Sequence, residues 1–197
     1  MHCYRRLVLL WGMLLQGCAQ NAHPASMIAL PASGMDASNP APANRRISIV
    51  DVTGGGGLGW IGESNVPNAA LQSALEQSLK TAGYLANDSA HAGIDLTVQL
   101  IRLDRPRAPA KIMRVKSVMR YTLVERVTRS TMLADTISTI GHADSGDAFW
   151  GTTRVRLAIE SAIRMNITCF LGVWRAYLQR RDNQDHSPFP TCADSVK

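Results

Sequence analysis

Apolar residues recur with strand and helix spacings from about residue 45 to residue 179, and this region is expected to fold. Residues 47–52 are rich in β-branched side chains and predict a first strand. A helix is expected between Pro67, which suits a helix start, and Gly83, which suits the position just after a helix end. Its predicted buried stripe is Leu71, Ala74, Leu75, Ser78, Leu79 and Ala82.

Three further strands are expected after this helix. Two long patterns, at about 93–103 and 112–127, are joined by a turn that holds Pro106 and Pro109, and a fourth strand is expected at about 131–140. Alternation sorts the residues of 112–127 onto two faces. The apolar face carries Met113, Val115, Met119, Tyr121 and Leu123. The opposite face carries Arg114, Lys116, Arg120 and Arg126.

A helix of about 25 residues with one apolar face is the last predicted element. Its start is expected near Thr152, with Asp147 or Thr152 as the capping residue. The side chains expected to pack on the sheet are Ile159, Ile163, Phe170 and Trp174, with Arg156 on the outer face. The element order β-α-β-β-β-α favours an α+β fold of two layers, in which two helices cover one face of a four-stranded mixed sheet.

The first 17 residues have the pattern of a secretory signal, because Arg5 and Arg6 precede a short apolar segment at 7–15. That segment is too short to span a bilayer. An ordinary secretory signal and an uncleaved anchor are both open alternatives to the more specific interpretation that follows.

The signal ends in Leu15-Gln16-Gly17-Cys18, which resembles a bacterial lipobox. The resemblance implies that a diacylglycerol is attached to the sulfur of Cys18 and that the chain is cleaved before this residue. Ala19 follows the cysteine, whereas an Asp at this position favours retention in the inner membrane of Gram-negative bacteria. The resemblance therefore implies a lipid anchor on the periplasmic side of the outer membrane.

Four segments are predicted along the chain: a signal peptide at 1–17, a lipidated Cys18 with a flexible tether at 18–44, a periplasmic domain at 45–179, and a mobile tail at 180–197. Residues 19–44 are rich in Ala, Pro, Ser and Asn and contain no Lys or Arg. Such a composition is typical of a tether, and a flexible chain of this length spans roughly 30 Å.

Basic residues are concentrated in one region of the chain, residues 102–129. The chain has 21 basic and 15 acidic residues, a net charge of +6, which falls to +4 when Arg5 and Arg6 leave with the signal. Residues 102–129 hold nine basic residues against Asp104 and Glu125. If both helices cover the apolar face, the opposite face is basic and exposed. It could bind phosphates of lipid A, phospholipid headgroups or an acidic protein, or it could be a solvated face whose like charges prevent edge aggregation.

Two other motifs are less specific. The glycine-rich residues 54–62 match G-x-G-x-x-G twice, but the next helix starts well beyond them and no second βαβ unit follows, so a flexible or packing loop is expected and no nucleotide. His142, Asp144, Ser145 and Asp147 are contiguous, whereas catalytic triads are assembled from separate loops. We expect a solvated loop there, and no catalytic residue, metal or cofactor.

Cys18, Cys169 and Cys192 remain after cleavage. Cys169 lies on the apolar stripe of the last predicted helix and is most simply a small buried residue. The periplasm also permits a disulfide between Cys169 and Cys192, and this alternative is open.

Two sets of residues resemble a family of uncharacterised proteobacterial lipoproteins over about 46–171. One set runs from Ser64-Asn65 through Ala74-Leu75-Glu76 to Gly83-Tyr84-Leu85. The other is Asp147-Ala148-Phe149-Trp150-Gly151 followed by Arg154, Arg156-Leu157-Ala158 and the residues 160–167. More loosely, the chain is similar to small α/β envelope lipoproteins of the YajG, PqiC and LptE kind, which attach to larger envelope machines and are not enzymes.

The resemblance implies a membrane-anchored, non-enzymatic interaction or accessory module of an envelope assembly or lipid-transport system, with a protein partner in the envelope. The alternative is a protein that binds an anionic envelope ligand through the basic sheet face. Nucleic acid is not an expected partner in this compartment.

Overall fold

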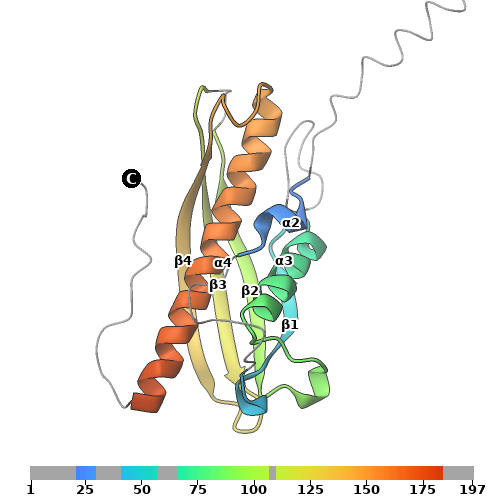
Figure 1. Ribbon diagram of the computed structural model, residues 1–197, viewed down its shortest axis with the longest axis vertical. Helices are drawn as coiled ribbons and strands as arrows, with labels where there is room; N and C mark the ends of the chain where they lie inside the picture. Colours follow the sequence, from blue (N-terminus) through green and yellow to red (C-terminus); the bar gives the residue numbers. More distant parts are fainter. Residues whose placement is uncertain (1–20, 30–40, 57–65, 107–109, 184–197) are drawn as a thin grey trace, which may run out of the picture.

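The computed structural model describes residues 21–29, 41–56, 66–106 and 110–183. Four long strands lie side by side, with the helices packed on one side of the sheet (Figure 1). The strands are β1 (Ile47–Thr53), β2 (Ile94–Asp104), β3 (Met113–Glu125) and β4 (Thr131–Ala143). The helices are α2 (Pro24–Met27), α3 (Asn68–Thr81) and α4 (Gly151–Asn183), with short 3-10 turns at Ala43–Arg45 and Ser89–His91.

The predicted fold class is confirmed. The strand order is β1-β2-β3-β4, with β1 parallel to β2 and the other neighbours antiparallel. The parallel pair requires a crossover, which α3 supplies, whereas the antiparallel strands are joined by direct turns. The structure adds the short helix α2 to the two predicted helices.

The helix boundaries follow local chemistry. Pro67 stands in the cap position before α3, and Gly83 takes a φ of 76°, the left-handed conformation that ends many helices. The start of α4 differs from the prediction, because Thr152 lies inside its first turn. The Asp147 carboxylate instead accepts a hydrogen bond from the backbone N–H of Asp144, 2.8 Å away, and so stabilises the preceding turn.

The core lies between α4 and the inner face of β3 and β4. The predicted inward residues Met113, Val115, Met119, Tyr121 and Leu123 are fully buried, and so are Ile159, Ile163, Phe170 and Trp174 of α4. The rings of Tyr121 and Phe170 stack with centroids 4.2 Å apart. α4 is long and apolar enough to cross a membrane, but 67% of its apolar stretch is buried inside the fold, as expected for the core helix of a folded domain.

A buried network of hydrogen bonds fixes the position of α4 along the strands of the sheet. The Tyr121 hydroxyl donates to Oδ1 of Asn166 (3.0 Å), and Nδ2 of Asn166 donates to the carbonyl of Ile137 (2.9 Å). The hydroxyls of Ser117 and Thr139 both donate to the carbonyl of Ala162, at 3.2 and 2.8 Å. Burial raises the pKa of Tyr121, so its hydroxyl stays protonated as a donor. Each buried polar group named here therefore has a partner.

Gly141 of β4 permits this arrangement. A Cβ at this position would lie 2.1 Å from the backbone nitrogen of Ala162 and 2.4 Å from the carbonyl oxygen of Ala158. The backbones of α4 and β4 therefore touch where Gly141 meets two small helix residues, and no side chain separates them.

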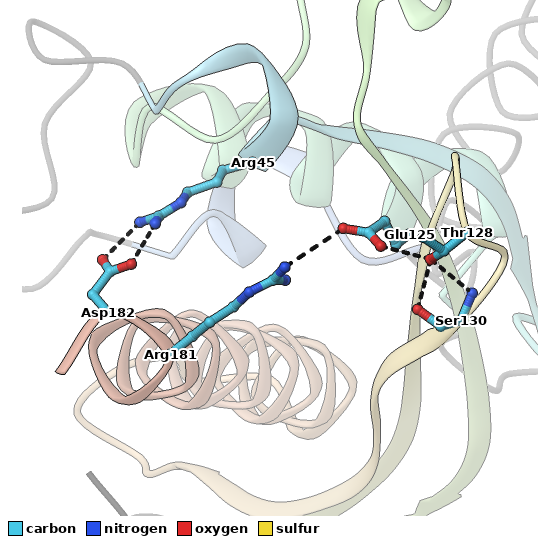
Figure 2. A network of polar contacts seen from close by, with 6 residues as sticks. All are labelled: Arg45, Glu125, Thr128, Ser130, Arg181 and Asp182. Atoms are coloured by element: carbon cyan, nitrogen blue, oxygen red, sulfur yellow. Dashed lines mark hydrogen bonds and ion pairs between the residues drawn. The ribbon is translucent and has the colours of Figure 1, made fainter. Parts of the chain in front are cut away.

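At the C-terminal end of α4, ion pairs join the helix to Arg45, in the 3-10 turn before β1, and to Glu125 at the end of β3 (Figure 2). The Arg45 guanidinium forms a double hydrogen bond with the Asp182 carboxylate, one of 2.8 Å. Arg181 lies 3.7 Å from Glu125, which also accepts a hydrogen bond from Thr128. The prediction that a mobile tail begins at residue 180 is therefore wrong for 180–183, which are helical; residues 184–197 lie outside the described part of the chain.

Replacing Gly141 by Ala should lower the free energy of unfolding by about 1–3 kcal/mol, because the new methyl group overlaps the α4 backbone. Gly172→Ala is the matched control: nothing lies near its Cβ position in α4, and Ala should stabilise the helix by roughly 0.5–1 kcal/mol. Denaturant unfolding of both variants measures the difference. Equal effects would contradict the close contact of helix and strand.

The hydrogen bond from Arg45 lowers the pKa of Asp182 below its ordinary value of 3.8. A carboxylate with a lowered pKa stabilises the fold above its unfolded-state pKa, and this contribution is lost as the pH falls through the lowered value. Amide exchange in the last turn of α4, corrected for intrinsic rates, should be constant down to about pH 5 and faster below about pH 4. Asp182→Asn should exchange faster than the unmodified protein at about pH 5, and the difference should shrink as the pH falls. Unchanged exchange in that variant at about pH 5 would contradict a stabilising Arg45–Asp182 pair.

Candidate interaction surface

The outer sheet face is the face of the sheet turned away from the helices. It is formed by Thr97, Gln99, Arg102 and Asp104 of β2, Arg114, Lys116, Val118, Arg120 and Thr122 of β3, and Thr136, Ser138 and Ile140 of β4. The predicted alternation of β3 is confirmed, since exposed and buried residues alternate from Met113 to Tyr121, apart from the half-buried Val118. None of the described helices lies on this side in Figure 1.

Three of the four predicted basic residues lie on this face. Arg114 is paired in register with His142, Lys116 lies between Asp104 and Ile140, and Arg120 lies between Gln99 and Thr136. All three side chains are exposed. The ion pairs found among the described residues involve none of the three.

Arg126, the fourth predicted residue, lies beyond the end of β3 on the same side of the sheet, and its charge is paired. It follows the end of β3, where its Nε donates to the Asp95 carboxylate at 3.0 Å and its guanidinium also reaches the carbonyl of Ser89. The hydrogen bond to Asp95 raises the pKa of Arg126. Strand alternation could not reveal this pairing, because it depends on the register of β3 against β2.

The charge of the outer sheet face is graded along the strands. Near the β2–β3 loop, Arg102 and Asp104 pair at 3.0 Å and cancel, whereas Arg114 and Lys116 add two positive charges, so this end is the more basic one. Neutral Thr97, Thr122 and Gln99 occupy the middle rows, and Asp95 lies towards the other end. The face can therefore attract an acidic surface with a defined orientation.

The N-terminal segment 21–29 packs into the domain, so the prediction of a flexible tether over 18–44 is wrong for these residues. Ala22, Met27 and Ala29 are almost completely buried, and α2 lies against both α3 and α4. The backbone N–H of Ala29 donates to the Ser78 hydroxyl at 2.9 Å. The apolar run at 27–30 within the Ala- and Pro-rich stretch was the available sequence signal.

A buried carboxylate holds the start of this segment. Glu160 of α4 is only 1% exposed, and its Oε1 accepts hydrogen bonds from the backbone N–H of His23 and from Arg156, both at 2.8 Å. Further along, the Arg164 guanidinium donates to the carbonyl of Ser26 at 3.1 Å. The expected outer-face position of Arg156 is therefore wrong, because its side chain is 12% exposed and paired.

The glycine-rich loop packs against the domain where it is described. Gly54 has a φ of 82°, and a Cβ there would lie 1.9 Å from the carbonyl oxygen of Leu100. The N–H of Gly55 donates to the side chain of Asn68, at 2.7 Å. These contacts fit the predicted packing role; residues 57–62 lie outside the described part.

The remaining predicted sites have separate outcomes. Asp144 and Asp147 hydrogen-bond within their own exposed turn, and among the described residues no group of three or more His, Cys, Asp or Glu side chains could hold a metal.

Cys169 is disulfide-bonded, so its interpretation as a free buried thiol is wrong. Cys18 and Cys192 lie outside the described residues, and the lipidation of one and the pairing of the other stay predictions.

No protein-family model and no curated protein matches the chain. Solved structures do share its fold. A Xanthomonas campestris protein described as a DUF330 protein superposes with a TM-score of 0.59 over 85% of this chain and 100% of its own, at 14% sequence identity. A candidate lipoprotein from Caulobacter crescentus gives a TM-score of 0.45 over 74% of this chain and 96% of its own, at 10% identity. The first likeness establishes the fold alone, and the second is too weak to support an inference.

Met27→Ala should lower the free energy of unfolding by about 2–5 kcal/mol, because it opens a cavity between α2 and the main helices. Met27→Leu, which nearly conserves the volume, should cost less than about 1.5 kcal/mol. Denaturant unfolding measures both values. If Met27→Ala is as stable as the unmodified protein, the segment is a free tether after all.

Proposed function

We propose that this chain is a lipid-anchored protein on the periplasmic side of the outer membrane, and that it serves as a non-enzymatic accessory module of an envelope assembly or lipid-transport system. The lipobox-like ending at Cys18 supports the anchor. The main observation in favour of an accessory module is the outer sheet face. It presents a row of basic side chains, and no described helix covers it.

The spacing of this row favours an extended acidic protein surface. Arg114, Lys116 and Arg120 project from one strand, and at about 3.4 Å per residue the first and last lie roughly 20 Å apart. A single phosphate contacts charges within about 4 Å, so one headgroup cannot engage the whole row. Thr and Gln side chains between the cations add hydrogen-bond donors and acceptors for a flat polar interface.

The second candidate is a binding protein for lipid A or phospholipid headgroups. Arg114 and Lys116 favour it, because they lie two residues apart on the same face and could share one phosphate. Both candidates use the same side chains, so the bound species must distinguish them.

Reversing two charges, Arg114→Glu with Arg120→Glu, should weaken recovery of the partner from mildly solubilised envelopes by about tenfold, because each exposed contact contributes roughly 0.2–1 kcal/mol and reversal turns attraction into repulsion. Lys80→Glu with Arg129→Glu is the matched control, since both residues are exposed away from the outer sheet face. The measurement is quantitative mass spectrometry of proteins and lipids that co-purify with the tagged chain.

Loss of a specific protein in the first variant but not in the control supports the accessory module. Loss of bound phospholipid or lipid A, from a chain that purifies without a protein partner, supports the second candidate instead. Identical co-purification from both variants would mean that the outer sheet face is only a solvated surface.

A further inference from the structure

The end of the domain that holds the β2–β3 and β4–α4 loops, here called the loop end, exposes large aromatic side chains. Phe149 and Trp150 stand just before α4 with 84% and 70% of their surface exposed, and their rings pack edge to face with centroids 5.4 Å apart. Ile112, just before β3, is 47% exposed. Soluble surfaces rarely place such side chains together without a partner, because burying them is favourable.

Arg154 holds the two loops of this end together. One nitrogen of its guanidinium donates to the carbonyls of Ala148 and Phe149, at 2.9 and 2.8 Å, and the other donates to the carbonyl of Ala110 at 3.4 Å. The Asp147 carboxylate closes the preceding turn by accepting from the N–H of Asp144. The aromatic pair is therefore displayed on a loop that is ordered before any partner binds.

The described N-terminal segment 21–29 runs along α4. His23 contacts Glu160, and Ser26 contacts Arg164, so the chain runs along α4 away from the loop end as it proceeds. His23 is therefore the contact nearer the loop end. Glu160 lies nine residues after Gly151, about 13 Å along the helix axis.

The length of chain before His23 then limits where a lipid can be. Cys18 precedes His23 by five residues, which reach at most about 17 Å. This reach covers the roughly 13 Å to the loop end, but the far end of α4 at Asn183 lies about 35 Å from Glu160. A domain that stands upright on a lipid at Cys18 would therefore have its loop end, and not its far end, at the membrane.

We propose that Phe149, Trp150 and Ile112 insert into the headgroup region of the membrane that holds the Cys18 lipid. This inference rests on the lipid anchor of the proposed function. Aromatic rings favour the membrane interface. Basic side chains such as Lys111 and Arg114 lie near this end and add attraction to anionic lipid, but burial of the exposed apolar side chains supplies the main contribution, so the contact should persist in added salt.

The test uses the full lipidated chain in vesicles of phosphatidylethanolamine with a minor share of phosphatidylglycerol and a nitroxide-labelled phospholipid. A fluorescent amino acid replaces Ser145, exposed in the β4–α4 loop, or Val127, which is 89% exposed in the β3–β4 hairpin at the opposite end. The nitroxide should quench the probe at Ser145 several-fold more than the probe at Val127. Adding Phe149→Ser and Trp150→Ser should remove the difference, and added salt should not.

Equal quenching at the two positions, or quenching that survives the double substitution, would overturn the insertion. Crosslinking from position 145 to an envelope protein, without quenching in vesicles, would assign the aromatic pair to a protein partner and would also overturn it. Flotation separates the two proposals: a chain that floats with the vesicles but is not quenched keeps its anchor and loses only the insertion. A chain that does not float, as expected for Cys18→Ser, has no lipid anchor, and both proposals are then wrong.

Discussion

The direct contact of α4 with β4, where Gly141 meets Ala158 and Ala162, sets the position of everything else in the domain. It places the carbonyl of Ala162 within reach of the hydroxyls of Ser117 and Thr139, so the helix cannot slide along the sheet without breaking buried hydrogen bonds. α4 in this position covers β3 and β4, whereas α3 packs against β1. The N-terminal segment contacts both helices and completes the helical layer.

The packed N-terminal segment limits how far the domain can lie from a membrane that holds a lipid on Cys18. A free chain between Cys18 and residue 44 would let the distance between the domain and the membrane vary by roughly 30 Å. A segment that is packed from Ala22 onwards leaves only a few residues between the domain and the proposed lipid. The strands run along the length of α4 in Figure 1, so a domain anchored at the loop end would stand with its sheet upright. The outer sheet face would then be presented sideways to a neighbouring protein, with its basic end nearest the membrane.

Much of the fold could be predicted from the sequence, because one face of each main element is apolar. The period of two in β3 and the period near 3.6 in α3 and α4 gave the right elements and the right buried residues. The packed segment 21–29 was missed because its composition is typical of a linker, and its few apolar residues become significant only beside two helices that are distant in sequence. The extension of α4 to Asn183 depends in part on Arg45, and no local pattern contains that pairing.

The same limit applies to the candidate surface. Alternation correctly placed Arg114, Lys116 and Arg120 outside the core, since side-chain direction on a strand is a local property. It did not reveal that Arg126 pairs with Asp95 of a neighbouring strand. Helix periodicity misassigned Arg156, whose partner Glu160 is buried and contacts the N-terminal segment. Exposed charge can be predicted from one element, but its pairing requires the register of two.

The distance between the domain and the membrane tests the role of the packed segment most directly. Neutron reflectometry of the lipidated chain on a supported bilayer measures the protein density as a function of height. An anchored and packed N-terminal segment predicts a layer that begins at the headgroups and extends for about 50 Å, the length of a 33-residue helix. A hydrated gap of roughly 30 Å between headgroups and domain would show instead that residues 18–44 form a flexible tether.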